Sequence, residues 1–100
     1  MKHVAVIILN WNGKHWLESF LNLVVERSPG ARVIVADNGS SDSSQSWVAA
    51  NAPSVEWLDL GSNHGYAGGY NRALSEIKDI RYAVLMNSDI EPIEGWLTPL

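Results

Sequence analysis

The chain has 100 residues, which predicts one domain large enough to bury roughly 60–68% of the surface that its unfolded form exposes. Its formal net charge is -4 and it has no lysine or arginine cluster, which argues against nucleic acid and anionic membranes as partners. The absence of cysteine excludes disulfides, thiolate metal sites and cysteine nucleophiles, and is compatible with a reducing compartment. We expect a cytoplasmic protein.

The first strongly apolar run, residues 4–9, is continuous rather than alternating and stops at a polar cluster. This pattern predicts a fully buried strand. The run is far shorter than the roughly 18 apolar residues that suggest a membrane span, and no small-residue cleavage site follows it. The sequence therefore predicts neither a membrane span nor a signal peptide in this segment.

Apolar runs alternate with helical patterns along the rest of the chain. Strands are predicted over residues 4–9, 33–36, 55–60 and 82–86. Helices are predicted over residues 14–27, from Ser41 or Asp42 to about residues 51–53, over residues 66–78, and from near residues 94–96. The third strand alternates apolar and acidic residues, which is typical of a strand at the edge of a sheet.

Strands that alternate with helices predict the α/β class, because each right-handed crossover returns the chain in the same direction. We expect a Rossmann-like parallel sheet of strand order 3-2-1-4 with flanking helices. In this order the winding of the chain reverses between the first and fourth strands, where such sheets bind ligands. Residues 10–12 and 87–89 would flank that crevice, with the loop at Asp37 beside them.

Asp37 follows a buried strand directly, so its carboxylate is expected at the rim of the sheet. There it can accept a hydrogen bond from the ring N–H of a bound uracil, thymine or guanine. The alternative is that Asp37 and Asn38 form a polar turn with Gly39 and that residues 40–42 cap the next helix. For Asp42, capping is the favoured interpretation.

Three glycines mark the junction between the third strand and its helix: Gly65, Gly68 and Gly69. Without side chains, this loop lets backbone N–H groups approach a diphosphate at a helix N-terminus. The spacing is neither a dinucleotide-binding fingerprint nor a Walker loop. The alternative is that Gly68 and Gly69 only allow the helix to pack closely on the sheet.

The segment Asn87, Ser88 and Asp89 follows the fourth strand. One carboxylate at this rim is sufficient in principle for a divalent cation that also binds diphosphate oxygens, although the segment taken alone favours a turn or a helix cap. The histidines form no metal-ligand pattern. Trp11, at the end of the first strand, is a candidate to stack on a base.

Four segments, in this order and each at the end of a predicted strand, resemble the family 2 glycosyltransferases of the GT-A fold. They are Ile-Leu-Asn-Trp-Asn-Gly, Val-Ala-Asp-Asn-Gly-Ser-Ser-Asp, Asn-His-Gly-Tyr-Ala-Gly-Gly-Tyr-Asn-Arg and Leu-Met-Asn-Ser-Asp. The resemblance implies that the chain is the donor-binding half of a GT-A fold. It also implies inverting transfer of a sugar from a nucleotide-sugar donor, usually with Mg²⁺ or Mn²⁺.

Carried over by position, the resemblance assigns base binding to Asn10, Trp11, Asn12 and Asp37, with Asn38 and Gly39 shaping the loop. It places Asn63, Gly65 and Asn71 beneath the donor. It puts the family's Asp-x-Asp metal motif on residues 87–89 and leaves Asp89 as the metal ligand. Two positions depart from the family pattern: Asn87 replaces an acidic residue, and Tyr70 stands where arginine is frequent.

The resemblance implies a UDP-, dTDP- or GDP-sugar donor and a saccharide or lipid-linked acceptor. The motif variants look most like a bacterial branch that includes rhamnosyltransferases, which suggests polysaccharide synthesis. In the family the general base is an acidic residue far beyond the metal motif, so it is expected beyond Leu100 together with the acceptor half. Residues 1–100 would then bind a donor without turnover.

Two other functions stay open for the sequence. The first is a non-catalytic nucleotide-binding α/β module, which needs no general base. The second is a plain α/β scaffold whose loops are only turns and caps.

Overall fold

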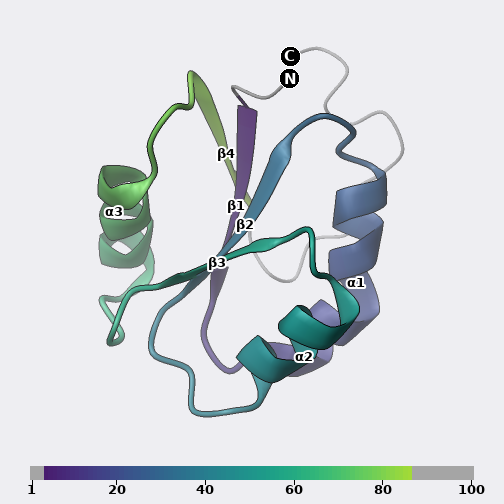
Figure 1. Ribbon diagram of the computed structural model, residues 1–100. Helices are drawn as coiled ribbons and strands as arrows, with labels where there is room; N and C mark the ends of the chain where they lie inside the picture. Colours follow the sequence, from purple (N-terminus) through teal and green to yellow (C-terminus); the bar gives the residue numbers. More distant parts are fainter. Residues whose placement is uncertain (1–3, 87–100) are drawn as a thin grey trace.

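The computed structural model describes residues 4–86, in which four strands alternate with three helices (Figure 1). In chain order they are β1 (Val4–Asn10), α1 (Lys14–Glu26), β2 (Arg32–Asp37), α2 (Ser44–Asn51), β3 (Glu56–Asp59), α3 (Tyr66–Glu76) and β4 (Tyr82–Met86). The helix predicted from near residues 94–96 lies outside the described residues.

The strands form one sheet of order β3-β2-β1-β4, and every neighbouring pair is parallel. This confirms the predicted order, with β3 at one edge of the described sheet. The register places Asn10 opposite Asp37, and Asp37 opposite Asp59. The carboxyl ends of β1, β2 and β3 therefore meet at one rim.

Helices cover both faces of the sheet: α1 and α2 lie on one face and α3 lies on the other (Figure 1). The continuous apolar runs of β1 and β2 explain this, because alternate side chains enter opposite layers. Val6, Ile8 and Val35 pack with the buried face of α1. Ala5, Ile7 and Ile34 pack on the other side with Tyr70 and Ala73 of α3.

Two predicted helix boundaries differ from the observed ones by more than one residue. Helix α2 starts at Ser44 instead of Ser41 or Asp42, because Asp42 uses its side chain to accept the N–H of Ser44. Helix α3 ends at Glu76 instead of residue 78. Ile77 is already extended and packs against the core under α3, which ends the helix.

Across residues 4–86, the longest helix is α1 with 13 residues, and no helix there is long and apolar enough to cross a membrane.

Candidate functional site

The first polar cluster at the rim joins Asn10, Asp37 and Ser40. The Asn10 Nδ2 donates to Asp37 Oδ1 over 3.0 Å and to Ser40 Oγ over 3.2 Å. The Ser40 hydroxyl donates to Asp37 Oδ1 at 2.5 Å, and the Ser40 N–H donates to Asp37 Oδ2 at 3.1 Å. The carboxylate of Asp37 is thus held in one orientation by two neighbours.

The two members of this cluster that end strands differ in what they offer a ligand. Asn10 is 0% exposed, and its Oδ1 accepts the N–H of Gly13 at 3.1 Å, so its whole amide is used inside the protein. Asp37 is 7% exposed, and within the described residues its Oδ2 accepts only the N–H of Ser40. A carboxylate oxygen has two lone pairs, so Asp37 Oδ2 can accept one more donor.

The segment after β1 is fixed on the loop after β2. The Asn12 N–H donates to Ser40 Oγ at 2.8 Å, and Asn12 Oδ1 accepts the N–H groups of Ser41 at 2.8 Å and Asp42 at 3.2 Å. Asn12 has a φ of 51°, the left-handed conformation that asparagine tolerates. Trp11 lies between these two held asparagines and is 57% exposed, so its indole is presented to solvent at the rim.

Asp42 caps two helices, which confirms its predicted role. Its Oδ2 accepts the N–H of Lys14, the first residue of α1, at 3.2 Å. Its Oδ1 accepts the N–H of Ser44, the first residue of α2, at 3.1 Å and also the Ser44 hydroxyl. Burial alone would raise the pKa of Asp42, but the hydrogen bonds from Ser44 and Lys14 outweigh it and lower the pKa.

The loop after β2 is joined to the loop after β3 by Asn38. Its Nδ2 donates to Asn63 Oδ1 at 3.3 Å and to the Gly65 carbonyl at 3.1 Å, while its Oδ1 accepts the His64 N–H at 2.9 Å. Gly39 has a φ of 86°, and a Cβ there would lie 2.9 Å from the backbone N of Asn63. The two loops are therefore in direct backbone contact.

The glycine junction before α3 is shaped by Asn63 and Gly65. Asn63 Oδ1 accepts the N–H of Gly65 at 2.8 Å, and Gly65 has a φ of 75°. A Cβ on Gly69 would lie 2.7 Å from Leu9 Cδ1, which supports the close-packing interpretation for this glycine. Gly68 has more room, since a Cβ there would lie 3.4 Å from the Cβ of His64.

Two further side chains of this region face different surroundings. Asn71 is exposed on α3, and among the described residues its side chain makes no hydrogen bond with the Asp37 cluster. Tyr70 is buried against the sheet, and its hydroxyl donates to the Met86 carbonyl at 2.6 Å. Burial raises the pKa of the Tyr70 phenol to about 12.

The predicted metal segment, Asn87, Ser88 and Asp89, lies outside the described residues. Within residues 4–86 there is no group of three or more His, Cys, Asp or Glu side chains that could hold a metal ion.

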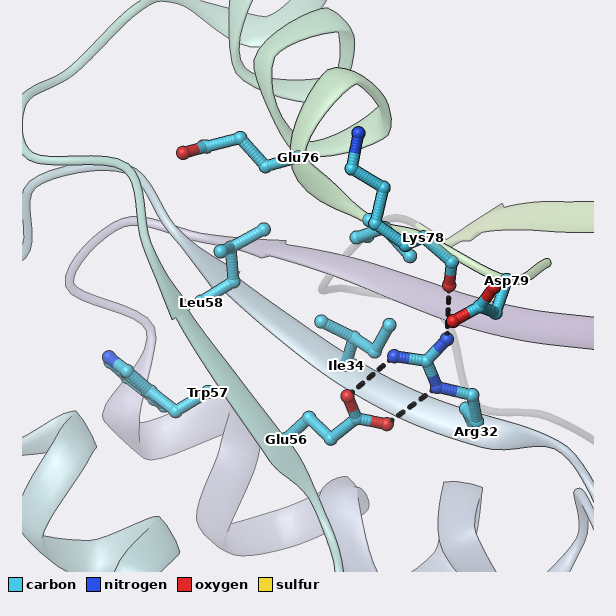
Figure 2. A pocket seen from close by; sticks show the side chains of 9 residues that line it. Arg32, Ile34, Glu56, Trp57, Leu58, Glu76, Lys78 and Asp79 are labelled. Carbon is cyan, nitrogen blue, oxygen red and sulfur yellow. Dashed lines mark hydrogen bonds and ion pairs between the residues drawn. The ribbon is translucent and has the colours of Figure 1, made fainter.

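A separate hollow of about 360 Å³ lies near the start of β2 and β3, away from the Asp37 rim (Figure 2). Arg32 donates from Nε and Nη2 to the two carboxylate oxygens of Glu56, at 2.8 and 2.7 Å, and from Nη1 to the Lys78 carbonyl at 2.8 Å. The hydrogen bond from Arg32 lowers the pKa of Glu56. Figure 2 shows this ion pair at the side of the hollow, whose lining also includes Ile34 and Leu58.

Sequence reasoning gave Ser40 no part in the candidate site beyond helix capping. Ser40 contacts Asn10, Asn12 and Asp37 at once, so it joins the two loops. The available signal was its position three residues after Asp37, where an aspartate commonly accepts a backbone N–H and forms a turn.

The chain matches the Glycosyl transferase family 2 model over residues 5–100. It is 33% identical, over 91 residues, to the low-salt glycan biosynthesis hexosyltransferase Agl10 of Haloferax volcanii. That alignment covers 88% of this chain and 28% of Agl10.

Solved structures of similar fold include S. aureus TarS 1-349 in complex with UDP-GlcNAc, with a TM-score of 0.81 and 21% identity over 99% of this chain and 30% of TarS. The mannosyltransferase PcManGT from Pyrobaculum calidifontis, in complex with GDP-Man and Mn²⁺, gives a TM-score of 0.75 and 24% identity over 95% of this chain and 30% of its own. This chain thus spans about three tenths of the length of the proteins it matches. The structural likenesses show the fold, that of GT-A glycosyltransferases. The match to the family model over residues 5–100 shows that the chain belongs to glycosyl transferase family 2.

Proposed function

We propose that this chain is the nucleotide-sugar-binding part of an inverting glycosyltransferase that transfers a sugar to an acceptor hydroxyl. The observation that carries the proposal is Asp37, a carboxylate fixed at the carboxyl end of a central strand with one acceptor position left on Oδ2. The carboxyl ends of parallel strands are where sheets of this kind bind ligands. The acceptor-binding half and the general base belong, in this proposal, to the rest of the full-length protein.

Base recognition falls to the rim of β1 and β2. Asp37 Oδ2 accepts the ring N–H of uracil, thymine or guanine, while Asn10 and Ser40 hold the carboxylate in place. The exposed indole of Trp11 stacks on the same base. Asn10 takes part through Asp37, since its own amide is enclosed.

The donor's diphosphate is assigned to the glycine junction before α3. Gly65 and Gly68 bring no side chain to the loop and the first turn of α3, and both Asn63, before the helix, and Asn71, in its second turn, are exposed. Backbone N–H groups and the helix dipole both favour an anion at this end.

A divalent cation, Mg²⁺ or Mn²⁺, completes the proposed donor site. Its assigned ligand is Asp89, beside Asn87 and Ser88, and two related structures contain Mn²⁺: PcManGT and the glucosyl-3-phosphoglycerate synthase of Mycobacterium tuberculosis. When bound, such an ion neutralises charge on the leaving nucleoside diphosphate.

The substrate class is a UDP-, dTDP- or GDP-sugar. UDP-GlcNAc in TarS and GDP-Man in PcManGT support this range, and the similarity to Agl10 supports hexosyl transfer. Rhamnosyl transfer, a role in bacterial polysaccharide synthesis, a saccharide or lipid-linked acceptor and a cytoplasmic location stay predictions. Residues 1–100 alone are expected to bind a donor without turnover.

A thermal-shift panel tests the proposal. UDP-, dTDP- and GDP-sugars are added with and without Mg²⁺ or Mn²⁺ to the parent, Asp37→Ala and Asp89→Ala, with Asp79→Asn as the control. A nucleotide present at 100-fold its dissociation constant stabilises the parent by about 2.7 kcal/mol. Asp37→Ala is expected to lose the response to every nucleotide, and Asp89→Ala only its metal-dependent part.

A parent that responds to none of the nucleotides would contradict the proposed function. A parent that responds in the same way as Asp37→Ala and Asp89→Ala would instead show that the site lies elsewhere. The control Asp79→Asn should respond as the parent does.

A further inference from the structure

Asn38 is a buried amide whose hydrogen bonds all go to a single loop. It is 3% exposed, and its partners are Asn63 Oδ1, the Gly65 carbonyl and the His64 N–H. These three groups are consecutive in sequence and lead directly into the first turn of α3. One side chain from the end of β2 therefore fixes the whole approach to α3.

Two glycines close the space around this amide. A Cβ on Gly69 would lie 3.0 Å from Asn38 Nδ2, and a Cβ on Gly39 would lie 2.9 Å from the backbone N of Asn63. The backbone of Asn38 is also held, because its N–H donates to the Asn10 carbonyl at 2.7 Å. Three chain segments thus meet at Asn38, and its side chain has no surface left for a ligand.

The geometry points to Asn38 as a positioning residue that holds the diphosphate-binding loop in register with Asp37, an inference that rests on the proposed function. The base is bound on the Asp37 side of this joint, and the diphosphate on the side of Asn63 and Gly65. Asn38 touches neither. It fixes the distance between the two half-sites, so that a ligand which spans both is bound without first ordering the loop.

This role predicts a selective loss. A nucleoside occupies only the base half and needs only Asp37, whereas a nucleoside diphosphate spans both halves. Removing the Asn38 side chain should therefore weaken the binding of the nucleoside diphosphate and leave the affinity for the nucleoside almost unchanged. A residue that only stabilised the fold would weaken both ligands together, and so would a residue that contacted the base.

The experiment measures dissociation constants in the full-length protein by calorimetry and ligand-observed NMR. The probes are UDP with uridine, and GDP with guanosine. For Asn38→Ala we expect the dissociation constant of the diphosphate to rise about tenfold and that of the nucleoside to change less than about twofold. Asp37→Ala should raise the dissociation constants of both probes. The matched control Asn22→Ala, at an exposed position, should change neither.

Asn38→Asp repeats the test if Asn38→Ala does not fold, because it keeps the size of the side chain and the acceptor for the His64 N–H but loses both donors to the loop before α3. Asn63→Ala breaks the same contact from its exposed side, but Asn63 also lies beside the proposed diphosphate, so this variant is used only together with Asn38→Ala. Where both variants fold, the double variant should lose less than the product of the two single effects, because each single change breaks the same contact.

The outcomes separate the inference from the function on which it rests. If the parent binds no nucleotide, or if Asp37→Ala binds as the parent does, the proposed function fails and this inference fails with it. If the parent binds and Asp37→Ala does not, the function stands. The inference is then overturned if Asn38→Ala, or Asn38→Asp where the alanine variant does not fold, weakens nucleoside and diphosphate binding equally or weakens neither.

Discussion

The hydroxyl of Tyr70 joins helix α3 to the last residue of strand β4. It donates to the Met86 carbonyl at 2.6 Å in a buried position. A buried carbonyl group needs a hydrogen-bond donor. Tyr70 supplies it immediately before the segment that carries Asn87 and Asp89 in the sequence.

Tyr70→Phe is expected to lower the free energy of unfolding by about 1–2 kcal/mol near neutral pH, because the buried Met86 carbonyl loses the hydrogen bond from the phenol. The pKa of the phenol is about 12 in the fold, above its ordinary value near 10, so folding favours the neutral form. The contribution is therefore complete below about pH 10 and is lost as the pH rises toward about 12. Urea denaturation across this range measures it.

The matched control is Tyr82→Phe, which alters an exposed tyrosine. It should leave the free energy of unfolding near that of the parent at neutral pH. A gap between the parent and Tyr70→Phe that stays constant up to about pH 12 would contradict the assigned role of the hydroxyl.

At the scale of single residues, the sequence predicts those site residues that stand directly after a buried strand. Asp37 and Asn10 were found in this way, because the change from apolar to polar is abrupt. Ser40 was missed as a site residue, since a hydroxyl in a turn has many roles and only the folded loops bring it to Asn12. The enclosure of Asn10 depends on the loop that folds over it, which no local pattern encodes.

The approach of α3 to the sheet is set by one small residue on its inner face. Gly69 lies over Leu9 and Asn38 with no room for a methyl group, whereas Gly68, one position earlier, faces the Cβ of His64 at an ordinary contact distance. Neighbouring helix positions point in directions 100° apart, so they meet different surroundings. The two glycines are thus chemically alike but structurally unlike.

Gly69→Ala is expected to destabilise the protein by about 1–3 kcal/mol, because the added methyl group forces Leu9 or the helix to move. Gly68→Ala serves as the control and should be neutral or stabilising, since alanine favours the helix by up to about 1 kcal/mol. The denaturation midpoints of the two variants measure this difference in stability. Equal midpoints would mean that α3 does not pack as closely as described.

Elements were easier to predict than their ends. Apolar runs, either continuous or alternating, together with helical spacing and cap residues located all seven described elements. The start of α2 and the end of α3 were misplaced by two or three residues. The first depends on a side chain, Asp42, that caps instead of joining the helix, and the second on Ile77, which leaves the helix to reach the core.

The molecule separates its candidate site from a second polar arrangement at the opposite end of the sheet. The carboxyl ends of the strands carry Asp37 and Asn38, and the amino ends of β2 and β3 carry the ion pair of Arg32 with Glu56. The pair joins two neighbouring strands, and Arg32 also holds the loop after α3 through Lys78. Stability and binding should therefore respond to different substitutions.

Glu56→Gln is expected to cost up to about 1 kcal/mol at neutral pH, since the pair is partly exposed but bidentate, and to leave nucleotide affinity unchanged. Arg32 lowers the pKa of Glu56 in the fold, so the contribution is present above the ordinary glutamate pKa of about 4.3 and is lost as the pH falls through the folded value. Urea denaturation at neutral and acidic pH, paired with nucleotide titration, measures both effects.

The control is Glu76→Gln, which removes the exposed pair with Arg72 within α3 and should cost about 0.3–0.5 kcal/mol. A loss of nucleotide affinity in Glu56→Gln would show that the two ends of the sheet are coupled.

The strand order of the whole sheet was predictable from two rules: crossovers are right-handed, and chains of this pattern wind outward from the first strand. How the loops at the rim interlock was not, because the contacts of Asn38 join residues about 25 positions apart. Such contacts follow from the completed fold and leave no periodic trace in the chain.

The position of β1 between β2 and β4 also has a consequence for synthesis. Val4 pairs with Tyr82, so one side of β1 has no partner in the described sheet until β4 has left the ribosome. Until then the nascent chain carries an open, strongly apolar strand edge at the centre of its future sheet. Unpaired edges of this kind invite pairing with other chains. The arrival of β4 removes this aggregation hazard.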